Sequence, residues 1–278
     1  MTSRLKQVFA GSVFAAIASI TLFSVILFTL LGPSLSGWTA EEVDWDALET
    51  PPDDRHHLGT DLVGRDLFTR IAEGGQLSLG IALLATGISV LIGVPWGALA
   101  GYVGGRTDQW MMRFVDTLYA LPFILVVILI VVVVGRNTWA LFAGLGAVYW
   151  LDIARIVRGQ AIRVRSAAYI QAARSMGAST RWIVIRHVLP NVAGPAFIYA
   201  TLTVPGIILA ESFLSFLGLG VQEPDASWGV LIADGTASME SAPWTLLFPA
   251  AFLATTVWSL NLLGDRLRDA WDPKRTRT

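Results

Sequence analysis

The sequence contains no cysteine and only two lysines among its 278 residues. Without thiols, disulfide bonds and metal sites built on thiolates are excluded. Neither Lys6 nor Lys274 stands in a G-x-x-x-x-G-K-[ST] segment, the loop whose glycine amides cradle nucleotide phosphates. No P-loop ATPase is therefore encoded here, and energy from ATP would have to arrive through another subunit.

Histidine is almost as scarce. The three histidines, His56, His57 and His187, all lie outside the long apolar runs, and no H-E-x-x-H motif occurs. An intramembrane hydrolase would need a metal motif or a nucleophile with a base, so this class is disfavoured. The neighbouring pair His56 and His57 has no obvious third ligand, which makes it a weak metal candidate, and no metal site is predicted.

Charge is scarce as well. Only 15% of residues are charged and 54% are hydrophobic, and the mean hydropathy is +0.60. Soluble domains carry roughly 25% charged residues. We therefore expect an all-α membrane protein whose single membrane domain contains several helices.

Six apolar runs are long enough to cross a bilayer, for which about 20 residues suffice. The first has 24 residues without a charge and no convincing cleavage site, so it is predicted to be a retained anchor. The fourth is the least regular, because Asp152, Arg155 and Arg158 crowd its end. The runs extend approximately over Val8 to Leu31, Leu79 to Gly101, Leu118 to Val134, Thr138 to Ala154, Val192 to Leu217 and Trp244 to Leu263.

The distribution of charge predicts the orientation. If the N-terminus is cytoplasmic, the inside segments hold 16 of the 20 basic residues and the outside segments hold 14 of the 21 acidic ones. This agrees with the positive-inside rule. Six transmembrane helices with both N- and C-termini cytoplasmic are therefore predicted.

One inside segment, residues 169–191, reads YIQAARSMGASTRWIVIRHVLPN and has no Asp or Glu. Gly177 suits the left-handed residue that closes a helix, and residues 179–180 can cap a second helix. Pro190 should end that helix, since proline cannot extend one from inside. Two short helices meeting at a bend are predicted, with Ala173 and Gly177 leaving a bare face for another protein. An ordinary amphipathic loop fits the pattern equally well.

The same segment resembles the EAA loop of ABC-importer permease subunits, which reads Glu-Ala-Ala, a glycine shortly after, then His-x-Leu-Pro-Asn. The matching residues are Ala172, Ala173, Gly177, His187, Leu189, Pro190 and Asn191. Gln171 replaces the family's Glu, which puts in doubt only a salt bridge to the partner. The resemblance implies a type I ABC importer permease fold whose loop, at about 159–191, couples to a separate ATPase.

A second stretch, HLGTDLVGRDLFTR from His57 to Arg70, resembles the His-x-Leu-Gly-Thr-Asp-x-x-Gly-Arg-Asp signature of dipeptide, oligopeptide and nickel permeases. Asp61, Arg65 and Asp66 can pair or cap locally, so a structural role is favoured over contact with substrate or its binding protein. Later stretches, down to NLLGDRLRDAWDP at 261–273, are similar to the C-type subunit of these permeases.

The resemblance implies a multi-pass protein of the cytoplasmic (inner) membrane that is a transport subunit and no enzyme. Implied partners are ABC ATPase subunits, a second homologous permease and an extracytoplasmic substrate-binding protein, besides the lipid bilayer; nucleic acid is not expected. No cofactor is expected, because the partners bind ATP. Residues 1–75 would form an anchor helix and extracytoplasmic segment, and 76–278 a core of five spans. Peptides are the most frequent substrates that the resemblance implies, and nickel or another small solute is the alternative.

Two features inside the spans have physical meaning of their own. Glu211 is the one carboxylate well inside a predicted span, so it is a functional candidate by default, although a bundle-facing, hydrogen-bonded carboxylate is favoured. An ion-driven secondary transporter would show internal repeats or intramembrane charge pairs, which are not found.

Gly93, Gly97 and Gly101 recur every four residues and predict close helix packing.

Overall fold

The computed structural model describes residues 13–135 and 137–271, and over these ranges the regular elements are all helices. Two isolated antiparallel bridges, Val43 with Arg65 and Thr60 with Asp66, tie the long loop between the first two helices. The all-α prediction is confirmed. In chain order the helices are α2 (Val13–Leu35), α3 (Leu67–Val103), α4 (Gly105–Tyr119), α5 (Phe123–Val134), α6 (Thr138–Arg165), α7 (Ala168–Ser175), α8 (Thr180–Ile183), the π-helix η1 (Val184–Val188), α9 (Leu189–Phe216), α10 (Trp228–Ala237) and α11 (Trp244–Trp271).

Five helices are long and apolar enough to cross a membrane, and the bent pair α4 and α5 makes six if it is counted as one span. The six-span prediction is confirmed in that form. The predicted start of the first span, Val8, lies outside the described residues, in which α2 begins at Val13.

The third span differs from its prediction. The run from Leu118 to Val134 was expected to be one helix, but the chain turns through 82° between Tyr119, the last residue of α4, and Phe123, the first of α5. Pro122 is the physical reason, because it has no N–H and disfavours helical geometry in the residue before it. The apolar composition of the run concealed this break.

The glycine stripe on α3 brings that helix against α6. A Cβ added to Gly93 would lie 2.7 Å from the carbonyl oxygen of Trp150, and one added to Gly101 would lie 2.5 Å from that of Arg158. At Gly97 a Cβ would collide with the carbonyl of Ala154. The predicted close packing is confirmed, and it is backbone against backbone.

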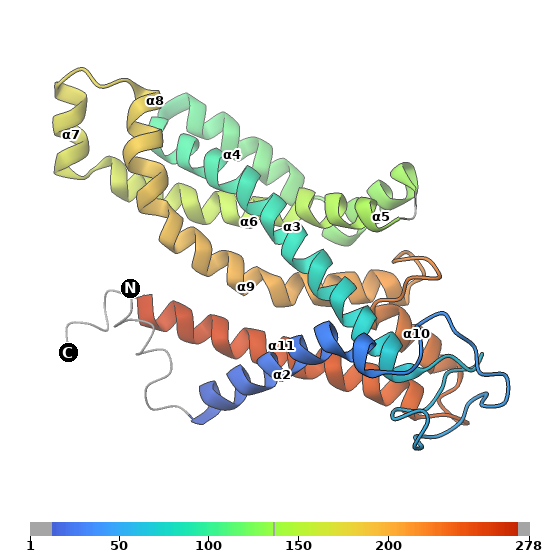
Figure 1. Ribbon diagram of the computed structural model, residues 1–278. Coiled ribbons are helices and arrows are strands. Elements are labelled where there is room, and N and C mark those ends of the chain that lie inside the picture. The colour runs from blue at the N-terminus through green and yellow to red at the C-terminus, as the bar shows by residue number, and fades with distance from the viewer. Residues whose placement is uncertain (1–12, 136, 272–278) are drawn as a thin grey trace.

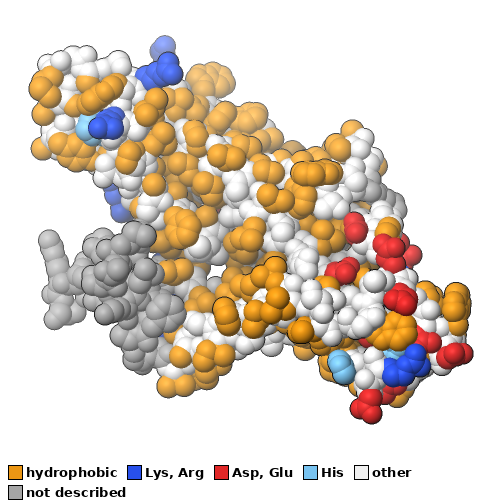
Figure 2. Space-filling model, viewed as in Figure 1, with side chains coloured by type: hydrophobic (Ala, Val, Ile, Leu, Met, Phe, Trp, Pro, Cys, Tyr) orange, Lys and Arg blue, Asp and Glu red, His pale blue; other side chains and the backbone are white. Residues whose placement is uncertain are grey.

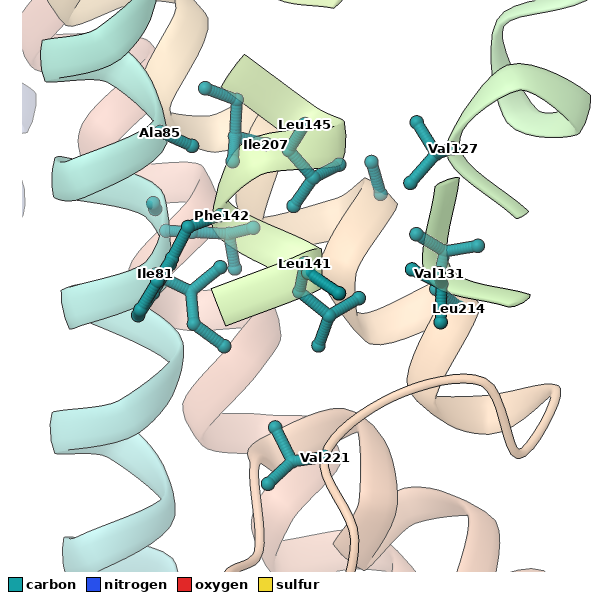
Figure 3. Packing of buried hydrophobic residues seen from close by; sticks show 14 of the residues in the cluster. Ile81, Ala85, Val127, Val131, Leu141, Phe142, Leu145, Ile207, Leu214 and Val221 are labelled. Atoms are coloured by element: carbon teal, nitrogen blue, oxygen red, sulfur yellow. The ribbon is translucent and has the colours of Figure 1, made fainter. Parts of the chain in front are cut away.

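A buried apolar cluster joins α3, α5, α6 and α9 (Figure 3). Ile81 and Ala85 of α3 lie toward Phe142 of α6 and Ile207 of α9, while Val131 of α5 lies on the far side. Helices α2 and α11 pack on each other, α2 also on α3 and α11 also on α9. Helices α3 and α9 therefore lie at the centre of the bundle, and the other long helices pack on them.

The two ends of the bundle differ in charge. Helices α7 and α8 lie at one end, called the elbow end below, and the loop 36–66 and α10 lie at the other, called the loop end (Figure 1). On the face shown in Figure 2, acidic side chains gather at the loop end and basic ones are prominent at the elbow end. This polarity follows the charge pattern seen in the sequence.

Candidate functional site

The elbow, here residues 166–191, turns at Gly177. The N–H of Gly177 donates to the carbonyl of Arg174 at 3.0 Å, and the N–H of Ala178 donates to that of Ala173 at 3.1 Å. These two bonds form a Schellman motif, for which Gly177 adopts φ +84°. Ser179 then caps α8 by accepting from the N–H of Trp182 at 3.3 Å. The predicted helix, glycine turn and capped second helix are confirmed.

The prediction that Pro190 ends the second helix is wrong. Helix α8 continues through η1 into α9, and Thr180–Phe216 behaves as one span of 37 residues. The N–H of Leu189 donates to the carbonyl of Val184, five residues earlier, so the chain makes a π turn just before Pro190. This turn lets the helix continue although Pro190 has no N–H to donate. The Asn191 side chain also donates to the carbonyl of His187 at 2.6 Å. The span predicted from Val192 consequently starts at Thr180.

Aromatic contacts hold the elbow together. The His187 ring lies 4.9 Å from that of Trp182 and 5.9 Å from that of Tyr169, measured between centroids, so it bridges α7 and α8. Ile170 and Ile183 are buried beneath, in the same apolar cluster as Tyr102 of α3. The elbow is thus anchored on the membrane helices.

The outer face of the elbow carries large apolar groups in the open. Met176 is 81% exposed and Trp182 49% exposed. Together with the buried Ala173 and the exposed Gly177 they line a shallow hollow of about 360 Å³. Ala172 faces outward beside it. Exposed groups of this size around a hollow are typical of a protein contact surface.

At the loop end, Asp61 lies between two arginines. It accepts from Nε of Arg65 at 2.8 Å, from the N–H of Arg65 at 2.9 Å, and from Nη1 of the buried Arg70. Burial alone would raise the pKa of Asp61, but the Arg70 charge, the backbone N–H of Arg65 and the Arg65 charge outweigh it, so the pKa lies below its ordinary value. Asp61 and Arg65 therefore stabilise the loop itself.

Asp66 caps α3, since its side chain accepts from the N–H of Thr69 at 2.9 Å. Its other oxygen faces Nδ1 of His56 at 3.0 Å, while Nε2 of His56 faces Asp44 at 3.4 Å. His56 is fully buried and stacks on Trp38, with centroids 4.6 Å apart.

His56 holds the first position of the family signature, and His57 does not. The spacing His-x-Leu-Gly, read from Leu58, already places the signature histidine at His56. His57 is exposed, and its ring meets the Phe68 ring edge to face with the centroids 5.8 Å apart. Within residues 13–135 and 137–271, no three His, Cys, Asp or Glu side chains are placed to hold a metal ion.

Glu211 is fully buried and faces the bundle. It accepts from Ser215 at 2.7 Å and from Ser78 of α3 at 3.3 Å. Ser78 in turn accepts from the N–H of Trp228, and the Trp228 indole donates to the carbonyl of Ile71. These bonds hold α10 against α3 and α9, which is the structural role favoured for this carboxylate.

The sequence interpretation missed Asp152. It stood at the end of the predicted span 138–154, but α6 runs on to Arg165, so Asp152 lies near the middle of the helix. The cluster of charges that made this span look irregular is explained by α4. Arg158 pairs with Asp108 at 2.5 and 2.7 Å, Arg155 pairs with Asp116 at 2.7 Å, and Asp152 accepts from the Tyr119 hydroxyl at 3.0 Å.

We expect Asp61→Asn to lower the free energy of unfolding by about 3 to 5 kcal/mol, because it leaves the buried Arg70 without its main counter-charge. Since the pKa of Asp61 is depressed in the folded state, its stabilising effect is complete above the unfolded pKa of about 3.9 and is lost as the pH falls through the lower folded value. Thermal unfolding of the protein in lipid nanodiscs between pH 3 and 7 measures this.

The exposed Asp54, in the same loop, provides the control. Asp54→Asn should leave the transition temperature and its acid dependence close to wild type. If Asp61→Asn unfolds at the wild-type temperature near neutral pH, the ion pairs of Asp61 do not stabilise the loop.

A family model described as the binding-protein-dependent transport system inner membrane component matches residues 93–277. The chain belongs to this family. It is therefore a multi-pass inner membrane transport component and no enzyme, which removes the hydrolase and the ion-driven secondary transporter from consideration. Membership implies partner subunits, namely an ATPase, a substrate-binding protein and a second permease.

Individual relatives match nearly the whole permease. The oligopeptide transport system permease protein OppC of Escherichia coli (strain K12) is 49% identical over 263 residues, which cover 94% of this chain and 87% of that protein. OppC of Haemophilus influenzae is 47% identical over 94% of this chain and 85% of its own length. The dipeptide transport system permease protein DppC of Bacillus subtilis is 44% identical over 92% and 80%.

Among solved structures, the MetNI methionine ABC transporter in inward-facing conformations matches with a TM-score of 0.57. The match has 20% sequence identity and covers 70% of this permease and 93% of that chain. At this identity the similarity concerns the fold alone. It confirms the predicted ABC importer permease architecture.

Proposed function

We propose that this permease forms, with a second homologous permease, the path by which di- and oligopeptides are imported at the expense of ATP. The observation that carries the proposal is the 44% to 49% identity, over more than nine-tenths of this chain, to permeases named for oligopeptide and dipeptide transport. Because the sequence has no P-loop, ATP would be bound by partner ATPases, and the permease itself needs no cofactor.

In this proposal the elbow receives the mechanical work. Gln171, Ala172 and Gly177 would contact a groove of the ATPase, while the buried Ala173, together with His187 and Pro190, shapes the elbow behind them. The exposed hollow around Gly177 supports this assignment, and so does the anchoring of the elbow on α3. Closure of two ATPases would then move the membrane helices and alternate the access of a central cavity.

The proposal places the elbow end and both termini in the cytoplasm, and the loop end toward an extracytoplasmic binding protein. The excess of Lys and Arg in the segments of the elbow end and the termini supports this orientation, because these residues gather in cytoplasmic segments. Residues 1–75 would act as anchor and extracytoplasmic segment, and 76–278 as the permease core. Asp61, Arg65, Asp66 and Glu211 would keep structural roles in this arrangement.

Gln171 tests the contact with the ATPase. Its side-chain amide donates to the carbonyl of Arg165 at the end of α6, at 3.0 Å. Gln171→Glu gives up this exposed bond, worth about 0.5 to 1.5 kcal/mol, and restores the charge of the family pattern. We expect tighter assembly in a pull-down of the ATPase, because charge-assisted contacts across an interface are worth more than an exposed hydrogen bond.

Gln171→Leu is the matched control, since it removes the same hydrogen bond and adds no charge. It should retain less ATPase than wild type, so the difference between the two variants measures the charge. Loss of assembly in Gln171→Glu, as severe as in Gln171→Leu, would contradict the assignment.

Reconstitution tests the proposed function directly. The permease, its second permease, its ATPases and the binding protein are placed in liposomes, and uptake of a labelled tripeptide is followed with internal and external ATP. We expect uptake that requires the binding protein and ATP hydrolysis. Accumulation of nickel or another small solute without peptide, or peptide uptake driven by an ion gradient alone, would overturn it.

A further inference from the structure

The break between α4 and α5 leaves residues 120–122 outside any regular helix within a candidate membrane span. Pro122 has no N–H; Leu125 and Val126 donate to the carbonyl of Pro122, but no side chain caps the amides of Phe123 and Ile124 at the start of α5. Hydrocarbon cannot satisfy such backbone groups, so irregular backbone occurs at membrane depth only where protein or water covers it. The break therefore faces a protein surface or a water-filled path, and it does not face lipid.

A cavity of about 530 Å³ lies in the angle of this break. The break and the start of α5 form one wall, and α6 forms the other through Tyr149, Leu151 and Asp152. The Tyr149 hydroxyl donates to the carbonyl of Gly206 in α9 at 3.0 Å, and the Phe123 ring meets the Tyr149 ring edge to face at 5.3 Å. Three helices thus fix the walls, and the cavity is preformed.

Asp152 is the single charged residue among the described residues that line this cavity. It lies between Trp150 and Ala154, the residues of α6 whose carbonyls pack against Gly93 and Gly97 in the α3 span. In the described part of the chain no Lys, Arg or His forms an ion pair with it; the nearby Arg155 pairs with Asp116 at 2.7 Å and lies over the Tyr119 ring. A carboxylate at such a depth faces a protein interior or a water-filled cavity and marks a functional site by default.

We propose that this cavity is a peptide site on the import path, in which Asp152 binds the N-terminal ammonium group of the passing peptide. The inference rests on the proposed function. An ammonium group supplies the cationic partner that Asp152 lacks, and the apolar walls accept side chains of differing shape without selecting among them. Uncapped N–H groups at the start of α5 can donate to a peptide carbonyl; in other transporters the N-termini of broken helices likewise face the polar, anionic groups of the substrate.

The volume is consistent with this ligand. Sites for small molecules commonly enclose about 300 to 1,000 Å³ and combine apolar walls with a few polar groups. Leu118, Leu121 and Val126 supply the apolar part, and the Tyr119 hydroxyl, which donates to Asp152, orients the carboxylate. Such a site would recognise the feature shared by all unmodified peptides.

Single-cysteine labelling tests whether the break faces water, and it exploits the natural absence of cysteine from this chain. In the complete transporter, Leu121→Cys should react with a charged maleimide, and the transported peptide, delivered by the binding protein, should slow that reaction at least fivefold. Leu83→Cys is the control, since Leu83 of α3 is 64% exposed outside the cavity and Leu121 is 50% exposed. Equal, slow labelling of both positions would overturn the inference.

Transport kinetics test the role of Asp152. With Asp152→Asn in the reconstituted transporter, KM for a tripeptide should rise about tenfold, equivalent to about 1.4 kcal/mol, with a smaller change in kcat. Asp152→Glu should return KM to within about threefold of wild type. An unchanged KM in Asp152→Asn contradicts the proposal.

Photochemical capture on the wild-type complex covers the case in which a variant fails to insert. A diazirine-bearing tripeptide should be cross-linked to residues 118–126 or 147–152, as mapped by mass spectrometry. Cross-links confined to other segments would overturn the site. If the wild-type transporter takes up no peptide, the proposed function fails; if it takes up peptide but cross-links elsewhere, only this site fails.

Discussion

Gly97→Leu is expected to prevent the bundle from assembling. At this position even a Cβ would collide with the carbonyl of Ala154, and the next contacts are the backbone N–H of Arg158 and the Cβ of Val157. These are backbone atoms and a Cβ, whose positions are fixed by the helix, whereas the end of a flexible side chain could adopt another rotamer. Overpacking commonly costs about 1 to 3 kcal/mol, and a clash between two backbones belongs at or above the top of that range.

The measurement is the yield of monodisperse protein by size-exclusion chromatography, together with thermal unfolding of what remains. We expect at least a tenfold lower yield for Gly97→Leu. Gly87→Leu is the matched control, because Gly87 lies on the same helix and a Cβ there meets nothing within 4 Å. Equal yields of the two variants would show that α3 and α6 can separate without loss of the fold.

Gly177→Trp is expected to abolish most peptide uptake while leaving membrane insertion intact. The φ of +84° at this position disfavours any side chain, at about 1 to 2 kcal/mol. The indole would also occupy the hollow beside Met176 and Trp182, where we place the ATPase contact. Reconstituted uptake should fall more than tenfold while the ATPases continue to hydrolyse ATP, so hydrolysis and transport are uncoupled.

Gly105→Trp provides a stringent control. Gly105 also has a positive φ, +60°, a Cβ there also meets open space, and it lies at the corner between α3 and α4 outside the elbow. It should keep most of the wild-type uptake. Wild-type transport by Gly177→Trp, or an equal loss in both variants, would remove the elbow from the coupling mechanism.

Sequence predicted those features that depend on local chemistry. Runs of apolar residues located the spans, and the turn at Gly177 followed from the one residue type that adopts positive φ at little cost. The glycine stripe on α3 predicted close packing without naming its partner. Each of these inferences needed only neighbours along the chain.

What escaped prediction depended on the local backbone path around a proline or on partners distant in sequence. Pro122 breaks its span and Pro190 does not, because a π turn before Pro190 changes which backbone groups bond there. No pattern in the sequence predicted that turn. Asp152 looked like a helix end until α4 was seen beside α6. The signature spacing already distinguishes His56 from His57, but the contacts of His56 with the carboxylates of Asp44 and Asp66 could not be predicted from the sequence.

The continuity of the helix through Pro190 has a mechanical consequence. Because Thr180–Phe216 is one continuous helical span of 37 residues, it forms an arm of about 55 Å that begins inside the elbow, and the π turn, Pro195 and Pro205 are the points at which this arm can bend. Tilting such an arm by about 10° displaces its far tip by roughly 10 Å at that length. A push near Trp182 would thus be carried along this helix toward the opposite mouth of the bundle, and the bending at the π turn and at the two prolines would set how far the tip moves.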